Sequence, residues 1–575
     1  MSFQTRFAHS DATRHLCVGA ELDPRFARAV LHELVTRYRR AVAPSYGVDV
    51  IPVVEHALRG ERRRAFRDAL LTAVLTAWLT LFPLPAGAAL LAALLARRTW
   101  RELSGTGRAG VVALVGIGAA LAGWAMMRYQ GALAASPAAG LLGPLGLTRV
   151  GAFLISVPAI ALAACAIPFL EWEVGRRWAG RHLDADHFRP GRVPVRLSRR
   201  MRRRLQAIDA QQWTSIVVYR SEARSPFVGA GWIVTRARWT ITVDIRRRGR
   251  SFLEGERAVI PFAPCELYGR IEDRLRPLRD ETGFEPHGLP DLEVSSRWYV
   301  DGLKRWKGRT AHEVLNAPAE ADALIDEMRR VIDVPDGRLR YFTCLRVEAW
   351  GRELIANTFL HIATQGSTLY LELTPCLLPP IRSDYKVVDL AAVPAAAERI
   401  PAAHDALAGC IDALLGAPIR LVDLNGWASE RIRERRDERE ERRDQREGRE
   451  RRDEPAPRAS RRSSLDCGAR TSVRELGSAP DVGYHFQQLD WRKYGQVLEK
   501  QMFNAITDFL EEHGVDVSEF QRQVTWIQNS GTMLVGSSVG DSAVIGRDNV
   551  GAAAQPAPGP APAAPAVPAT SGRAG

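Results

Sequence analysis

The sequence predicts an α-helical multi-pass membrane region joined to a cytoplasmic α+β domain with antiparallel strands, followed by a disordered linker and a disordered C-terminal tail. Three observations predict this fold class. Long apolar runs without charge occur between residues 69 and 170. Runs of β-prone residues and helical periodicity alternate between residues 206 and 427. Beyond residue 428 the chain is first dense in charge and later dense in Ala and Pro.

The predicted membrane region covers residues 66–170 and rests on three apolar runs. The runs without any charged side chain are residues 69–96, 109–127 and 150–170. Each is near or above the roughly 20 residues that span a bilayer. The first run has 28 residues, about 42 Å as one straight helix, and Pro83, Pro85 and Gly87 at its middle favour a helical hairpin.

Charge distribution favours the hairpin. Arginines precede the first run and fill the connector 97–108, whereas the loop 130–148 has no charge. Because short basic loops stay cytoplasmic, we expect four short helices in the inner (plasma) membrane with both termini cytoplasmic. A count of three helices stays open, since each hairpin arm is only about 14 residues long and could be re-entrant.

The first 65 residues read as a small cytoplasmic helical unit. Residues 24–40 predict an amphipathic helix. Its apolar face consists of Phe26, Val30, Leu31, Leu34 and Val35. We expect this face to pack on the membrane or on the later domain.

Composition excludes several chemistries. The formal net charge is +13, but only five of the 79 basic residues are Lys, so the arginine bias says little about function. The seven cysteines are scattered without a CxxC pair or a His/Cys cluster at metal spacing, so we expect no metal and no cofactor. No GxxxxGK loop is present, which disfavours an NTPase.

A polybasic segment, residues 171–205, follows the last apolar run. It ends in Arg199, Arg200, Arg202, Arg203 and Arg204. Such a run suits contact with the anionic lipids of a bilayer, although control of topology alone would explain it as well. Aromatic residues do not alternate with these arginines, so we expect no specific nucleic-acid partner.

Residues 206–427 form the predicted α+β domain. The strands are expected at residues 213–219, 239–245, 340–348, 354–364 and 367–374, and helices at 311–332 and 391–415. The last two strands are joined by Gln365-Gly366, short enough for a tight hairpin. The loop SPFVGAGW (225–232) lacks the third glycine of a dinucleotide loop, so we interpret it as a strained turn.

Catalytic signatures are weak in this domain. The polar candidates are His287, Asp301, His361 and Glu372. His361 follows Phe359 in an apolar strand, where a structural role is more common than a catalytic one. No Ser, Cys or Lys has the local setting of an activated nucleophile, so no catalytic residue is assigned.

Beyond the domain, residues 428–482 read as a charged disordered linker. Residues 430–454 hold eleven arginines and eleven acidic residues, and such a segment cannot bury a core. Residues 483–528 then predict a helical hairpin with its first helix closed by Gly514. Docking on the main domain and self-association into a homo-oligomer both stay open for this hairpin.

Residues 529–551 are rich in Gly and in β-prone pairs. The near-repeat consists of Leu534, Val535 and Gly536 followed by Val544, Ile545 and Gly546. This segment resembles bacterial amyloid-signalling motifs related to the RIP homotypic interaction motif, although neither copy has the Gln that usually separates the two β-branched positions. The resemblance implies assembly with a protein partner; a loosely ordered glycine-rich tail is the alternative. Residues 552–575 read as an Ala/Pro-rich disordered tail.

A second resemblance covers about four fifths of the chain. Its residues are DATRHLC (11–17), AVAPSYGVDVIPVV (41–54), SPFVGAGW (225–232), HIATQGSTLYLELTP (361–375) and LLPPIRSDY (377–385). In these motifs the chain resembles uncharacterised multi-pass membrane proteins of high-GC actinobacteria. The resemblance implies an inner-membrane location and transfers no activity.

Three functions follow as hypotheses. The leading one is a non-enzymatic membrane scaffold or sensor with a cytoplasmic domain that binds a ligand or partner. A membrane-bound, hydrolase-like enzyme acting through the α+β domain is the second. The third is amyloid-type signalling in a conflict or defence system.

Overall fold

The computed structural model describes part of the chain. The described residues are 10–37, 39–83, 86, 137–190, 197–248, 250–251, 255–256, 258–279, 289, 291–306, 309–310, 315, 328–329, 332, 337–389, 412–422 and 467–529. Residues 84–85 and 87–96 of the first apolar run and the whole of the second therefore fall outside them, as do His287, the linker 428–466 and the repeat at 534–546.

An N-terminal helical unit comes first. It contains α2 (Asp11–Leu22), α3 (Pro24–Leu31), a π-helical turn (His32–Thr36), the start of α4 (Val50–Leu81) and, later in the chain, α8 (Arg199–Gln212). Ser10, Asp23 and Asp49 cap the three N-terminal α-helices, each accepting a hydrogen bond from a backbone N–H of the first turn. The five apolar residues predicted to share one face are all buried, and α3 packs on α4.

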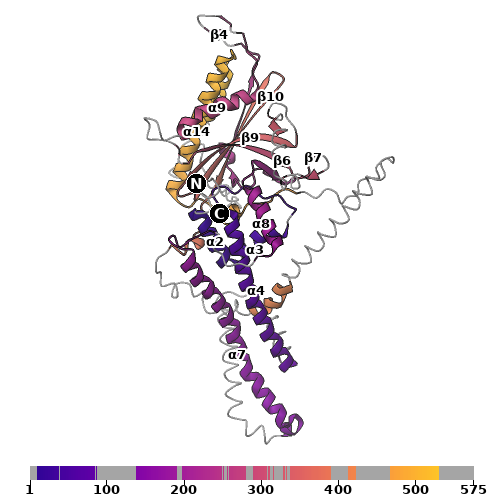
Figure 1. Cartoon of the computed structure of the whole chain (residues 1–575). Helices are drawn as coiled ribbons and strands as arrows, with labels where there is room; N and C mark the ends of the chain where they lie inside the picture. The colour runs from indigo at the N-terminus through magenta and orange to yellow at the C-terminus, as the bar shows by residue number, and fades with distance from the viewer. Residues whose placement is uncertain are drawn as a thin grey trace, which may run out of the picture.

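Two long helices, α4 and α7 (Pro137–His182), leave this unit side by side and project away from the rest of the molecule (Figure 1). They run antiparallel. The Trp78 indole donates to Ser156 Oγ at 2.8 Å near one end of the contact, and the Arg63 guanidinium donates to Glu171 at 2.6 Å near the other.

The expected multi-pass region is wrong for the described part of the chain. Within the described residues one helical segment, Ser156–His182, is long and apolar enough to cross a membrane, and only 6% of its most apolar stretch is buried. The predicted boundary at residue 65 is also absent, because α4 continues through it without a break. Residues 52–67 of that helix carry buried contacts and arginines, and its apolar portion ends at Leu81 before Pro83.

A seven-stranded sheet forms the second half of the molecule. Its strands are β1 (Ile216–Tyr219), β2 (Trp232–Ile233), β3 (Trp239–Asp244), β6 (Glu293–Asp301), β9 (Leu339–Ala349), β10 (Leu354–Gln365) and β11 (Thr368–Leu378). The order is β1-β6-β9-β10-β11, and β11 pairs with β2 at one end and β3 at the other. The predicted meander is present as β9, β10 and β11, with a tight link in which Gly366 has φ +63°. The antiparallel prediction fails at one edge, since β1 pairs with β6 in parallel and the sheet is mixed.

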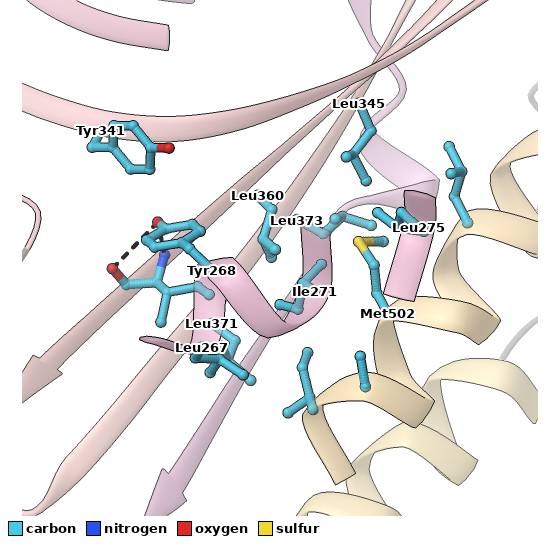
Figure 2. Packing of buried hydrophobic residues seen from close by; sticks show 14 of the residues in the cluster. Leu267, Tyr268, Ile271, Leu275, Tyr341, Leu345, Leu360, Leu371, Leu373 and Met502 are labelled. Atoms are coloured by element: carbon cyan, nitrogen blue, oxygen red, sulfur yellow. Dashed lines mark hydrogen bonds between the residues drawn. The ribbon is translucent and has the colours of Figure 1, made fainter. Parts of the chain in front are cut away.

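One face of this sheet is covered by helices. The covering helices are α9 (Pro264–Arg279), α14 (His485–Glu512) and α15 (Ser518–Asn529). Figure 2 shows Leu267, Ile271 and Met502 from these helices against Leu360 and Leu373 of the sheet. Each fully buried side chain of this size contributes about 1.5–3 kcal/mol. The apolar face of the predicted helical hairpin is thus used inside the molecule, and Gly514 closes α14 with φ +72°.

Tyr268 ties α9 to the backbone of this sheet. Its hydroxyl accepts from the Ile362 N–H at 2.6 Å (Figure 2). The pairing of β10 with β9 ends at Leu360, so the N–H of Ile362 lies beyond the part of β10 that pairs with β9. The hydroxyl therefore replaces a missing strand partner, and burial raises the pKa of Tyr268 well above its ordinary value.

The opposite face is covered by loops. Residues 41–48 and the loop 225–231 lie over it, and Phe227 stacks on Phe359 with ring centroids 4.5 Å apart. Residues 467–482, expected within the linker, also belong here: Ala469 bridges to Tyr219 beside β1, and α13 (Val473–Leu476) follows.

Candidate functional site

A cavity of about 250 Å³ opens at one end of the loop-covered face. Three segments that are distant in the sequence meet there: the connector before α4, the end of α8 with its link to β1, and strands β6 and β9. The lining residues are Pro44, Ser45, Tyr46, Gln212, Trp213, Ser215, Glu293, Ser295, Ser296, Arg297 and Arg346. The volume lies just below the roughly 300–1,000 Å³ typical of sites for drug-sized molecules, so only a small ligand would fit.

Strand alternation places the charged residues of the cavity. Glu293, Ser295 and Arg297 are spaced by two along β6 and share one face, and Glu293 is the register partner of Arg346 on β9. Val294 and Trp298 of β6 and Leu345 of β9 point to the other face and pack in the core under the helices. The same strands therefore supply apolar packing on one side and a polar wall on the other.

Two carboxylates form ion pairs with Arg346. Its guanidinium bonds to Glu293, and its Nε lies 3.1 Å from Glu348 Oε1. Glu348 also pairs with Arg352 at 2.9 Å. Burial raises the pKa of Glu348, and the two arginines oppose that shift.

Arg297 has a different environment. It is 9% exposed, donates to the Thr214 carbonyl at 2.9 Å, and its guanidinium carbon lies 5.3 Å from the centre of the Tyr46 ring. Arg346 lies at 5.4 Å from the same ring, so Tyr46 contacts two cations. Within the part of the chain that the structure describes, no ion pair joins Arg297 to a carboxylate, and neither its Nε nor Ser45 Oγ has a hydrogen-bond partner.

The thiols and the phenol at and beside the cavity are weak nucleophiles. Cys344 lies beside it, and burial raises the pKa of the Cys344 thiol to about 11. Burial also raises the pKa of Tyr46 and of Cys376. A thiol or phenol shifted in this direction stays protonated at neutral pH and is a weak nucleophile.

The polar candidates from the sequence lie farther along the same face. His361 and Glu372 are register partners on β10 and β11, whereas Asp301 ends β6 and accepts from Ser221 Oγ at 3.0 Å. None of the three lines the cavity. The structure therefore brings His361 and Glu372 together, and His287 lies outside the described residues.

His361 and Glu372 are each held by other groups. His361 Nδ1 is 2.8 Å from the Tyr341 carbonyl, and burial lowers the pKa of this histidine. Glu372 accepts from Arg238 at 2.6 Å, from Tyr370 at 3.1 Å and from the Thr374 hydroxyl at 3.2 Å. These partners fix both side chains as parts of a structural network.

The loop 225–232 binds an internal carboxylate. The N–H groups of Gly229 and Gly231 donate to Glu475 Oε1 at 2.9 and 3.0 Å. Both glycines have positive φ, and a Cβ on Gly231 would lie 2.1 Å from the Leu377 carbonyl oxygen. The turn interpretation therefore holds, with a carboxylate of the chain itself where a phosphate loop would hold its ligand.

The arginines assigned to membrane contact begin α8. Arg199, Arg200, Arg202 and Arg203 are exposed. Arg204 is half-buried and donates to the Leu34 carbonyl at 2.8 Å. Four of the five are thus free to meet a lipid surface, and the fifth joins α8 to the helical unit. Among the described residues no group of three or more His, Cys, Asp or Glu side chains is placed to hold a metal ion.

The sequence did not identify Arg297 and Arg346 as site residues. The chain contains so many arginines that composition does not indicate which of them are buried. The alternation Glu293-x-Ser295-x-Arg297 in a strand was the available signal, because it puts charge on a face that a sheet domain buries.

Comparison with known proteins gives one positive result. The profile of an AbeC-like domain matches residues 238–543, more than half of the chain. No curated protein and no solved structure matches. The match begins beside β3, includes the cavity strands β6 and β9, and continues past α15. The chain therefore belongs to the AbeC-like family.

Proposed function

We propose that this protein is a non-enzymatic, membrane-associated sensor whose AbeC-like domain binds a small polar ligand. The observation that carries the proposal is the cavity built jointly by the N-terminal helical unit and the sheet. A ligand there contacts residues 44–46 and 212–215 from one side and β6 and β9 from the other. Its binding therefore favours one arrangement of the two units.

Apolar exposure supports association with a membrane. Leu162, Phe169 and Val174 of α7 are 70%, 60% and 56% exposed, and Phe66 of α4 is 73% exposed. Large exposed apolar side chains gathered on one helix, as on α7, are typical of interaction or membrane surfaces. The arginines that follow the apolar part of α7 favour placing the sheet domain on the cytoplasmic side of the inner membrane.

A buried ionic joint supports communication between the units. Glu21 is fully buried on α2 and accepts from Arg59 at 2.9 Å and Arg63 at 2.8 Å. Arg63 also bonds to Glu171 of α7, so one arginine links α2, α4 and α7. A shift of the helical unit at the cavity would be carried to α7 through these rigid contacts.

Membrane association is tested by fractionation. Full-length protein in cell membranes is expected to resist extraction by alkaline carbonate and high salt. Replacing Leu162 and Phe169 by Glu is expected to release it, whereas replacing exposed Glu222 by Gln is not. Release of the unaltered protein by salt alone would contradict the membrane assignment.

Ligand binding is tested by thermal stability. A library of small polar metabolites is screened against the full-length protein in detergent, and we expect a compound that raises its unfolding temperature. The rise should vanish in Ser45→Phe, which fills the cavity, and persist in Ser383→Phe, which alters an exposed serine. A rise that is unchanged in Ser45→Phe would place the ligand elsewhere.

A further inference from the structure

We propose that the cavity is an oxyanion site and that Arg297 is the cation that holds the ligand. This inference rests on the proposed function, because it names the chemical class of the ligand in the same cavity. It assigns to the ligand a carboxylate or phosphate group, which the fork of a guanidinium binds through two parallel hydrogen bonds.

The arginines near the cavity differ in their carboxylate partners. Two of the nearby arginines have carboxylate partners: Arg346 bonds to Glu293 and Glu348, and Arg352 bonds to Glu348 and lies 3.8 Å from Asp291. Arg297 forms no such ion pair within the described chain. Three arginines and three carboxylates balance in number at this wall, but among the described residues the guanidinium of Arg297 has no carboxylate within ion-pair distance.

The charged side chain of Arg297 is buried. A guanidinium stays protonated in any protein environment, so Arg297 cannot escape the penalty of burial by losing its proton. Buried charges are paired in stable proteins, since an unpaired one is costly. Its carbonyl contact and the face of Tyr46 offset only part of this penalty. A residue kept in this condition at the wall of a cavity points to a partner that arrives from outside.

Two polar atoms that can donate hydrogen bonds at the cavity have no partner among the described residues. Ser45 Oγ is buried at the cavity with no partner among the described residues, as is Arg297 Nε. Gln212, by contrast, is already used: its Oε1 accepts from Val50 N and its Nε2 donates to Asp49. A ligand that satisfies these groups must bring hydrogen-bond acceptors, and an oxyanion brings them together with a negative charge that suits the guanidinium of Arg297.

The size and the lining of the cavity limit which ligand can bind. The cavity of about 250 Å³ admits a small molecule only. Pro44, Tyr46 and Trp213 give its wall apolar surface for a short carbon skeleton. A small carboxylate and a small phosphate share the chemistry that Arg297 requires, and the binding experiment distinguishes them.

The test is calorimetric titration of full-length protein in detergent at constant ionic strength. The probes are acetate, succinate and inorganic phosphate, with acetamide as the neutral shape match of acetate and ethylammonium as a cation. We expect at least one oxyanion to bind and neither acetamide nor ethylammonium to do so. Preference for succinate or for phosphate then identifies the source of the oxyanion.

Three variants locate the binding. Arg297→Met is expected to weaken oxyanion affinity by about tenfold or more, and Arg297→Lys to weaken it less because the charge remains. Arg340→Met is the matched control, since Arg340 is an exposed arginine on β9 outside the cavity. If Arg297→Met does not fold, Arg297→Lys and Ser45→Phe carry the same test.

Each outcome has one meaning. Oxyanion binding that is equal in the unaltered protein and in Arg297→Met overturns the inference. Binding of neutral or cationic probes alone also overturns it, while the sensor proposal stands if that binding is lost in Ser45→Phe. Failure of all probes, together with failure of the metabolite screen, overturns both.

Discussion

The two faces of the seven-stranded sheet are built from the same strands and treat charge in opposite ways. The face under α9, α14 and α15 is a continuous apolar core. The loop-covered face buries Arg297, Arg346, Glu348 and Glu372 around an aromatic cluster. Helices can cover a face only through side chains, whereas loops also bring backbone groups and polar residues. The helix-covered face therefore stabilises the fold, and the loop-covered face can hold a polar binding site.

The buried arginines Arg346 and Arg297 are expected to differ most in their contribution to stability. Arg346→Met is expected to lower the free energy of unfolding by about 3 kcal/mol, because it leaves partly buried Glu293 without this partner and buried Glu348 with Arg352 alone. Arg297→Met should change it by about 1 kcal/mol at most, since no carboxylate is abandoned and the lost carbonyl bond is offset by removal of an unpaired charge. Denaturant unfolding of both variants in detergent measures the difference. Equal losses would show that Arg297 is a structural residue.

The helix-covered face is tested by Leu371→Ala. Leu371 is fully buried in the core shared by the sheet and α9. A loss of about 2–5 kcal/mol is expected from the missing contacts and the cavity that remains. Affinity for the ligand should be unchanged in the folded variant. A change of affinity as large as that in Arg297→Met would contradict the separation of the two faces.

The glycine loop is tested by Glu475→Gln. The glutamine can still accept from Gly229 and Gly231 through one oxygen, but its NH₂ faces the Ser472 N–H, which now donates to Glu475 Oε2 at 2.9 Å. A loss of about 1–3 kcal/mol is expected from this unsatisfied donor. Thermal unfolding followed by tryptophan fluorescence measures it. An unchanged unfolding temperature would mean that the carboxylate does not hold the loop.

The pH dependence provides the smallest effect. Burial lowers the pKa of both His15 and His361 below the ordinary 6.5. Below about pH 6.5 the unfolded chain therefore binds protons that the folded chain does not, and stability falls as the pH is lowered. Each histidine contributes at most about 1.4 kcal/mol per pH unit. His361→Asn keeps a donor for the Tyr341 carbonyl and should reduce the slope between pH 6.5 and 5; an identical slope would exclude His361 as a source.

Local sequence patterns predicted much of the sheet domain. Alternation and turn chemistry located β9, β10 and β11, because each strand is long and bounded by Gly or Pro. Helical periodicity located α14, whose face includes Leu498, Met502 and Ile506. The parallel pairing of β1 with β6 could not be predicted, since it joins segments separated by α9.

The predicted membrane region was wrong, and the cavity was not predicted, for a different reason. Apolar length was interpreted as several membrane helices, whereas residues 69–81 of the first run continue α4 and bury Leu71, Leu75 and Trp78 in a cluster with residues of α7. The cavity depends on Ser45 and Tyr46 lying over Arg297, a contact across about 250 positions of the chain that local pattern does not encode. Charge alternation in a strand is the part of this signal that a sequence does carry.

An experimental structure of the full-length protein purified with its natural ligand would show directly what the cavity binds. We predict density for a small oxyanion in the cavity, within hydrogen-bond distance of the Arg297 guanidinium and the Ser45 hydroxyl. A structure in which Arg297 is paired with a carboxylate of the protein and the cavity is closed would contradict it.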